Sequence, residues 1–312
     1  MPVRVVKQWN VEDTEPPVTI SRDGQLALVA TGMNNSIDCL RVPAGTKVHG
    51  LDGHSSNVKA LAIAPDRLRG ASGAEDGEIR LWELATGKLI SVLKGHSQRV
   101  TSIEFASDGK FLLSGSWDNT CRLWDVGTFQ SVSILRGHSQ GVTGVSIAPD
   151  GKTAASSSFD CGVRVWETPS GKCIEERPGH ESKVMCVSIS RTGGHLVAGD
   201  TRGYLSISDL PPAQLRVVGP FSRSIDTVKL SVDGARAYIG LGGGGFWSFD
   251  LETQNATQLF ELTGRFPDQL PFGLHFAISD DARYVVAARA ASAAIIELER
   301  PPSRFRFFGR RS

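Results

Sequence analysis

The sequence predicts an all-β fold made of seven repeated four-stranded sheets. Three markers that recur along the 312 residues support this: a Gly-His pair, a tryptophan followed by an acidic residue, and a tight turn preceded by alternating apolar residues. A fixed period of 20–50 residues is typical of repeat architectures, in which each unit packs against its neighbours.

The first two markers share one period. Successive Gly-His histidines stand 42 residues apart, and so do successive tryptophans. The histidines are His54, His96, His138 and His180, and the tryptophans are Trp82, Trp124 and Trp166.

The third marker, a turn of the form Ser/Ala-x-Asp-Gly, extends the count to seven. Two apolar residues separated by one other residue precede each turn, which indicates a strand with one buried face. In the third unit the four strands are predicted at 100–105, 110–116, 120–125 and 131–135. The seven turns begin at Ser21, Ala64, Ala106, Ala148, Ser190, Ser231 and Ser279.

Four strands in every 42 residues, with Gly-His and Trp-Asp marks, resemble the WD-repeat family. The resemblance covers nearly the whole chain and is most specific in units two to four. It implies one seven-bladed β-propeller domain over residues 1–312, in which blades with two apolar faces stack around a channel. The blades are predicted at 11–52, 53–94, 95–136, 137–178, 179–218, 219–266 and 267–303.

Both ends of the chain are candidates for closing the ring. Residues 1–10 and 304–312 are predicted as closing or edge strands, the latter with alternating basic and aromatic residues. In the family the N-terminal strand commonly completes the last blade. We therefore favour pairing of residues 3–8 within the last blade, with the C-terminal segment beside or over it.

Composition and charge narrow the classes of function. The chain is 40% apolar and its net charge is +1, which gives no reason to expect nucleic acid or an anionic membrane as a partner. We find no signal peptide and no membrane-spanning run, so we expect a cytoplasmic protein, or a nuclear one in a eukaryote. Five cysteines without a C-x-x-C motif indicate reduced thiols, and we expect no metal and no cofactor.

The resemblance also implies a hydrogen-bonded relay inside individual blades, from tryptophan through a hydroxyl and an imidazole to an aspartate. In unit two the serine position holds Ala74, and in unit five the aspartate and tryptophan positions hold Arg202 and Ser208. The implied members are His96, Ser116, Asp118 and Trp124, then His138, Ser158, Asp160 and Trp166, with His54, Asp76 and Trp82 in unit two.

A nucleophilic triad uses the same residue types as this relay. Recurrence at one period in adjacent units, and the lack of a G-x-S-x-G elbow, favour the structural interpretation. Gly240–Gly245 matches the dinucleotide pattern, but a strand follows it where a helix would be needed, so we interpret it as a turn. No catalytic residue is predicted.

In the family, partners usually bind the narrower top face around the channel mouth. Trp117 and Phe159 would be exposed aromatics on adjacent blades beside Arg99, and Lys59, Arg99 and Lys183 would form a basic arc suited to an acidic peptide. The positions carried over are Asn57, Lys59, Glu75, Arg99, Trp117, Phe159, Lys183, Met185 and Arg289.

The sequence therefore predicts a non-catalytic scaffold or adaptor that binds proteins or peptides on this face. One alternative is a reader of a short acidic or modified peptide, and a less favoured one is an enzyme with its active site at the channel mouth. We expect a monomer, or a subunit of a larger complex.

Overall fold

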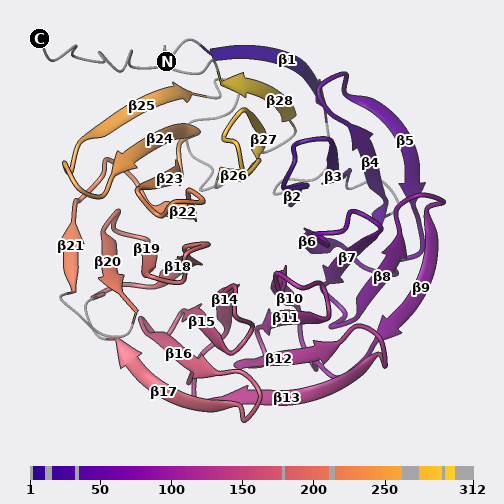
Figure 1. Cartoon of the computed structure of the whole chain (residues 1–312), viewed down its shortest axis with the longest axis horizontal. Helices are drawn as coiled ribbons and strands as arrows, with labels where there is room; N and C mark the ends of the chain where they lie inside the picture. The colour runs from indigo at the N-terminus through magenta and orange to yellow at the C-terminus, as the bar shows by residue number, and fades with distance from the viewer. Residues whose placement is uncertain are drawn as a thin grey trace, which may run out of the picture.

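The computed structural model describes residues 3–10, 16–31, 35–177, 180–210, 215–261, 274–289 and 292–298. These residues form 28 strands, which group into seven antiparallel four-stranded sheets. The sheets stand as blades around a central channel (Figure 1). The predicted seven-bladed all-β propeller is confirmed.

Each blade runs as a meander from the channel to the rim, and we number the blades in chain order. Blade one holds β2 (Val18–Ile20), β3 (Leu26–Ala30), β4 (Ile37–Arg41) and β5 (Thr46–Leu51). Blade two holds β6 (Val58–Ile63), β7 (Arg69–Ala74), β8 (Ile79–Glu83) and β9 (Lys88–Leu93). Blade three holds β10 (Val100–Phe105), β11 (Phe111–Ser116), β12 (Thr120–Asp125) and β13 (Gln130–Arg136).

The next three blades repeat this order. Blade four holds β14 (Val142–Ile147), β15 (Thr153–Ser158), β16 (Val163–Glu167) and β17 (Lys172–Arg177). Blade five holds β18 (Val184–Ile189), β19 (His195–Asp200), β20 (Leu205–Asp209) and β21 (Arg216–Val218). Blade six holds β22 (Ile225–Leu230), β23 (Arg236–Leu241), β24 (Gly245–Asp250) and β25 (Ala256–Glu261).

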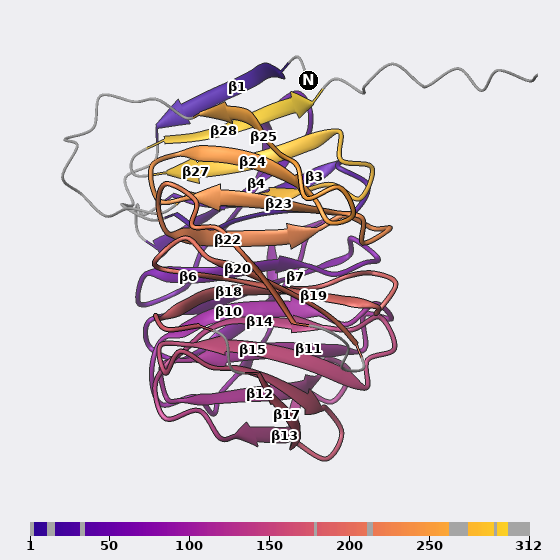
Figure 2. The ribbon, with the colours of Figure 1, turned by 90° about the vertical axis from the view of Figure 1, so that its left-hand side faces the viewer.

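Blade seven combines the two ends of the chain and closes the ring. It holds β26 (His275–Ile278), β27 (Tyr284–Arg289), β28 (Ser292–Leu298) and, as its outermost strand, β1 (Val3–Asn10). Strand β1 pairs antiparallel with β28, with Val5 opposite Ile296, and Figures 1 and 2 show the two strands side by side. The predicted closure by the N-terminal strand is confirmed, whereas residues 304–312 lie outside the described residues.

The turn after each inner strand has a simple local cause. In blade three the carboxylate of Asp108 accepts the backbone N–H of Lys110 at 2.9 Å, and Gly109 N–H bonds to the Ala106 carbonyl at 3.0 Å. Gly109 has a φ of +68°, a conformation that glycine adopts without steric cost. Arg67 takes the same conformation in blade two with a φ of +61°, so the turn forms even where glycine is missing.

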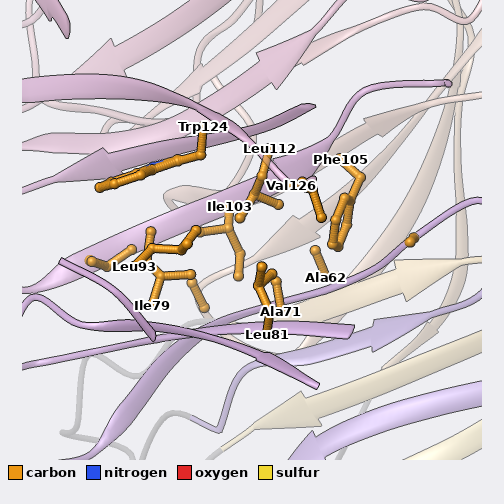
Figure 3. Packing of buried hydrophobic residues seen from close by; sticks show 13 residues of the cluster. Ala62, Ala71, Ile79, Leu81, Leu93, Ile103, Phe105, Leu112, Trp124 and Val126 are labelled. Atoms are coloured by element: carbon orange, nitrogen blue, oxygen red, sulfur yellow. The ribbon is translucent and has the colours of Figure 1, made fainter. Parts of the chain in front are cut away.

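Neighbouring blades are held together by apolar side chains between their sheets. The indole of Trp124 in blade three packs in one buried cluster with Ile79, Leu81 and Leu93 of blade two (Figure 3). Removing a buried tryptophan side chain typically costs about 3–5 kcal/mol. The tryptophan that marks this repeat in the sequence therefore packs between two neighbouring blades.

Side-chain hydrogen bonds also join the inner strands of adjacent blades. The hydroxyl of Thr101 donates to the carbonyl of Val142 at 2.7 Å, and Thr143 donates to Val184 at the same distance one blade later. No helix in the described part of the chain is long and apolar enough to span a membrane.

Candidate functional site

The channel opens on two faces of the ring. The top face is the face on which the inner strands begin, and the turn face is the opposite one, which carries the turns after those strands. A cavity of about 630 Å³ occupies the channel, and Lys59, Arg99, Trp117, Phe159 and Met185 line its top end.

Four top-face side chains from blades three to five contact one another in a row, which we call the aromatic ladder: Arg99, Trp117, Phe159 and Lys183. The guanidinium of Arg99 lies 4.6 Å from the centre of the Trp117 ring, and the two aromatic rings are 5.9 Å apart. The ammonium of Lys183 lies 5.1 Å from the centre of the Phe159 ring. A cation over an aromatic face contributes about 0.5–1 kcal/mol at an exposed site, so these contacts favour the observed arrangement of the four side chains.

The backbone places the ladder. Trp117 N–H bonds to the Arg99 carbonyl at 3.0 Å, and Phe159 N–H bonds to the Gly141 carbonyl at 3.1 Å. A Cβ at Gly141 would come within 3.0 Å of the Trp117 ring and 3.3 Å of its Cα. Gly141 thus leaves room for the indole, which remains 38% exposed.

Glu75 offsets part of the positive charge beside the ladder. Its carboxylate lies 3.5 Å from the Arg99 guanidinium and 3.9 Å from the Lys59 ammonium, and Asn57 Nδ2 donates to it at 3.4 Å. Lys183 lies on the opposite side of the ladder. The predicted basic arc is therefore partly neutralised at the blade two end and strongest at the blade five end.

Arg289, the remaining carried-over top-face residue, ends β27, and its side chain lies outside the described part of the structure. Within the described residues, no group of three or more His, Cys, Asp or Glu side chains is placed to hold a metal ion.

The relays inside blades three and four use different serines from those implied by the resemblance. In blade three the Trp124 indole donates to Ser114 Oγ at 2.8 Å, and Ser114 Oγ lies 2.8 Å from His96 Nε2. His96 Nδ1 lies 2.8 Å from the carboxylate of Asp118. Blade four repeats this through Trp166, Ser156, His138 and Asp160, with the corresponding distances 2.8, 2.7 and 2.9 Å.

Ser116 and Ser158 are therefore wrong as relay members. Ser116 lies two residues after Ser114 on the same side of the strand, nearer the top face. Its hydroxyl donates to the Gln98 carbonyl at 3.0 Å and accepts Asp118 N–H at 3.1 Å. Ser158 makes the same two bonds, to the carbonyl of Gln140 and from the N–H of Asp160. These serines hold the turn that carries the aspartate.

The relay in blade two contains its hydroxyl but lacks its last link. The Ser72 hydroxyl accepts the Trp82 indole N–H at 2.8 Å and lies 2.6 Å from His54 Nε2. The alanine at position 74 therefore does not interrupt the relay. His54 Nδ1 has no hydrogen-bond partner among the described residues, and the Asp76 carboxylate instead accepts the Ser55 hydroxyl at 2.7 Å. Burial, and then the charge of the nearby Arg80, lowers the pKa of His54 to about 4.

Blade five rebuilds the relay from other positions. His180 Nε2 lies 2.8 Å from Ser206 Oγ and His180 Nδ1 lies 2.9 Å from Asp200. The aspartate stands two residues before Arg202, which occupies the position that the pattern assigns to it. The hydroxyl comes from β20, whereas in blades two to four it comes from the second strand of the blade. Ser208, at the tryptophan position, instead accepts a hydrogen bond from the Arg177 guanidinium. Blade five thus keeps an imidazole–aspartate link, although the position where the pattern places the aspartate holds Arg202.

Burial and hydrogen bonding decide what the relays can do. Ser114 is 0% exposed and His96 is 7% exposed, so a substrate cannot reach the hydroxyl. Burial alone would raise the pKa of the Asp118 carboxyl, but hydrogen bonds from His96 and Thr120 outweigh it and lower that pKa. A fully bonded, inaccessible chain of polar groups is the arrangement expected of a structural network.

Comparison with known proteins agrees with this geometry. The model of the "WD domain, G-beta repeat" family matches residues 45–83, 87–125, 129–167 and 171–207. Each matched segment contains the outermost strand of one blade and inner strands of the next.

Two curated proteins match shorter stretches. An uncharacterized WD repeat-containing protein of Synechocystis is 40% identical over 75 residues, which cover 23% of this chain and 21% of that protein. The ribosome biogenesis protein ERB1 of Debaryomyces hansenii is 42% identical over 38 residues, 12% of this chain and 5% of that protein. The chain thus spans about a fifth or less of these relatives. With its four matched repeats and seven four-stranded blades, the chain belongs to the WD-repeat family.

Proposed function

We propose that this protein is a non-catalytic scaffold that binds partner proteins or peptides on its top face. WD-repeat proteins generally act as scaffolds for protein interactions. The single observation that carries the proposal is the aromatic ladder at the channel mouth, with Trp117 at 38% exposure.

Trp117 has the properties of an interface anchor. Tryptophan and arginine are the residue types that most often dominate binding energy, and here they are stacked on each other. Arg99 and Phe159 contact the indole from two sides, so little side-chain freedom remains to be lost when a partner packs on it.

The charge beside the ladder favours a second, narrower version of the function, the reading of short acidic peptides. Lys59, Arg99 and Lys183 supply three cations, and Glu75 contacts the first two. Lys183 is exposed, and its described contact is the Phe159 ring, so its charge is available to a carboxylate of a bound peptide. A bound peptide with an acidic residue next to an apolar one would place its carboxylate at Lys183 and its apolar side chain on Phe159 and Trp117.

Affinity capture with matched variants tests the scaffold proposal. The wild type, Trp117→Ala and Leu68→Ala would each be immobilised and the captured proteins quantified by mass spectrometry. Leu68 is the control because it is a large apolar residue on the turn face with 62% exposure. We expect Trp117→Ala to lower the affinity for top-face partners by about 1–3 kcal/mol while Leu68→Ala keeps it. Equal capture by all three proteins would exclude the top face.

A separate titration tests the acidic-peptide version. A fluorescent glutamate-rich peptide and its glutamine counterpart would be titrated into the wild type, Lys183→Gln and Lys172→Gln. Lys172 is exposed on the outermost strand of blade four and serves as the charge-matched control. We expect only Lys183→Gln to weaken the acidic peptide, by about two- to fivefold at low salt. Equal affinity for both peptides would contradict acidic specificity and leave the scaffold proposal standing.

A further inference from the structure

The turn-face end of the channel carries charged side chains that reach across it from different blades. Arg22 of blade one donates to the Ser107 hydroxyl of blade three at 3.3 Å, and Arg191 of blade five lies 3.0 Å from Asp280 of blade seven. Each contact passes over an intervening blade. All four residues line the same 630 Å³ cavity.

Asp280 contacts the backbone of one arginine and the side chain of the other. Its backbone N–H bonds to the Arg22 carbonyl at 2.8 Å, and its carboxylate accepts a bond from the Arg191 guanidinium at 3.0 Å. Deeper in the cavity, the Lys229 ammonium lies 3.6 Å from the Glu104 carboxylate. This end of the channel thus holds three cations and two carboxylates.

The electrostatics of the pair are unfavourable without an additional anion. Burial, and after it the positive charge of Arg191, lowers the pKa of Arg22. Two like charges in a partly desolvated space repel each other, and an anion placed between them removes that repulsion. The negative charges of Asp280 and Glu104 oppose this lowering of the Arg22 pKa, but more weakly.

Both guanidinium groups keep donors for such an anion. Among the described residues, Arg22 uses its side chain for Ser107 alone and Arg191 uses its side chain for Asp280 alone. A guanidinium presents several N–H groups in a planar fork that matches the oxygens of phosphate. The Ser107 hydroxyl, which accepts from Arg22, has its own proton to donate.

We propose that the turn-face mouth of the channel binds a phosphate-type oxyanion between Arg22 and Arg191, with Ser107 as a third donor. The ligand is a small anion with at least two negative charges, because a monovalent carboxylate adds little to what Asp280 already supplies. This site lies at the opposite end of the channel from the aromatic ladder. It is therefore independent of the proposed scaffold function.

Phosphorus NMR measures this binding directly on the full chain. Inorganic phosphate and pyrophosphate would each be titrated with the wild type, Arg191→Gln, Arg22→Lys and Arg67→Gln at constant ionic strength. Arg67 is the control because it lies on the same face but pairs with Asp23 at 2.6 Å. Acetate, added at the same ionic strength, tests the requirement for two charges.

We expect saturable binding of phosphate or pyrophosphate to the wild type, at least about tenfold weaker in Arg191→Gln and unchanged in Arg67→Gln. Arg22→Lys keeps the charge and loses the planar fork, so binding should weaken there too. No saturable binding of either anion at millimolar concentration would overturn the proposal. So would an equal loss in Arg67→Gln, or competition by acetate at equal concentration.

Discussion

His180 Nδ1 lies 2.9 Å from the carboxylate of Asp200, and both side chains are only 1% exposed. Blade five has no relay tryptophan, so this buried pair is its main polar link between the loop that holds His180 and the end of β19. Replacing Asp200 would leave a buried imidazole without its partner, which is costlier than losing an exposed contact.

We expect Asp200→Ala to lower the free energy of unfolding by about 2–3 kcal/mol. Arg202→Ala should change it by less than about 0.5 kcal/mol, because the Arg202 ion pair with Glu181 lies on the surface, with the two side chains 59% and 88% exposed. Urea unfolding of the two variants measures both values. Equal destabilisation would mean that Asp200 is not the functional equivalent of Asp118.

Ser114 and Ser116 should differ in their effect on the blade three tryptophan. Ser114→Ala removes the acceptor of the Trp124 indole and should cost about 2 kcal/mol, whereas Ser116→Ala should cost about 1 kcal/mol. The indole N–H proton resonance of Trp124 should move in Ser114→Ala and stay in place in Ser116→Ala. A shift in Ser116→Ala alone would restore Ser116 to the relay.

His54 should make stability depend on pH in a defined window. Its pKa is about 4 in the folded chain against an ordinary 6.5, so between these values the unfolded chain takes up a proton that the folded chain does not. Stability should therefore be constant above about pH 6.5 and fall as the pH drops toward 4, by on the order of 3 kcal/mol.

His54→Gln should make this part of the profile shallower, and buried His138, whose pKa is also lowered by burial, should account for part of the slope that remains. His49→Gln, at a histidine bonded to the Ala85 carbonyl near the surface, should retain the full slope. Denaturant titrations at a series of pH values would show the difference. An unchanged slope in His54→Gln would assign the proton uptake to another group.

Strand β1 should be essential to the closed ring. Deleting residues 1–10 exposes the edge of β28 and removes the pairing of Val5 with Ile296, so we expect the melting temperature to fall by about 10 °C or more. Scanning calorimetry measures the shift. A melting temperature within a degree or two of wild type would show that another segment can close blade seven.

The ring was predictable because its features recur along the sequence. The turn around Gly109 bonds within a few residues, and Trp124 packs against the blade that precedes it in the chain, so both contacts follow from the order of the repeats. Closure by the N-terminal strand was an expectation from the family resemblance, because both ends of the chain were candidates for the outermost strand of blade seven.

The relay was harder to predict, for a physical reason. Ser114 and Ser116 lie two residues apart on the same side of one strand, and both are fully buried. The sequence pattern therefore cannot tell which of the two hydroxyls the imidazole contacts. In blade five Asp200 and Ser206 restore the contacts from unexpected positions because the relay constrains where the polar atoms lie in space. The strand that supplies them is free to vary.

Contacts across the channel lay outside any sequence argument, because they join blades that are not neighbours. The sequence did place the four ladder residues on one face, and the structure brings them into contact. It could not show that Glu75 lies beside Arg99 or that Gly141 leaves space for the Trp117 indole. Whether a partner uses them stays a prediction.

The Lys229–Glu104 pair links blades six and three, which stand on opposite sides of the ring. Sheet-to-sheet packing passes a disturbance only from one blade to the next along the circumference, whereas this pair offers a route along a diameter. Blades three and six therefore contact each other directly as well as through the blades between them. A partly exposed ion pair of this kind is weak, so it adds only a small direct coupling across the channel to the packing between neighbouring blades.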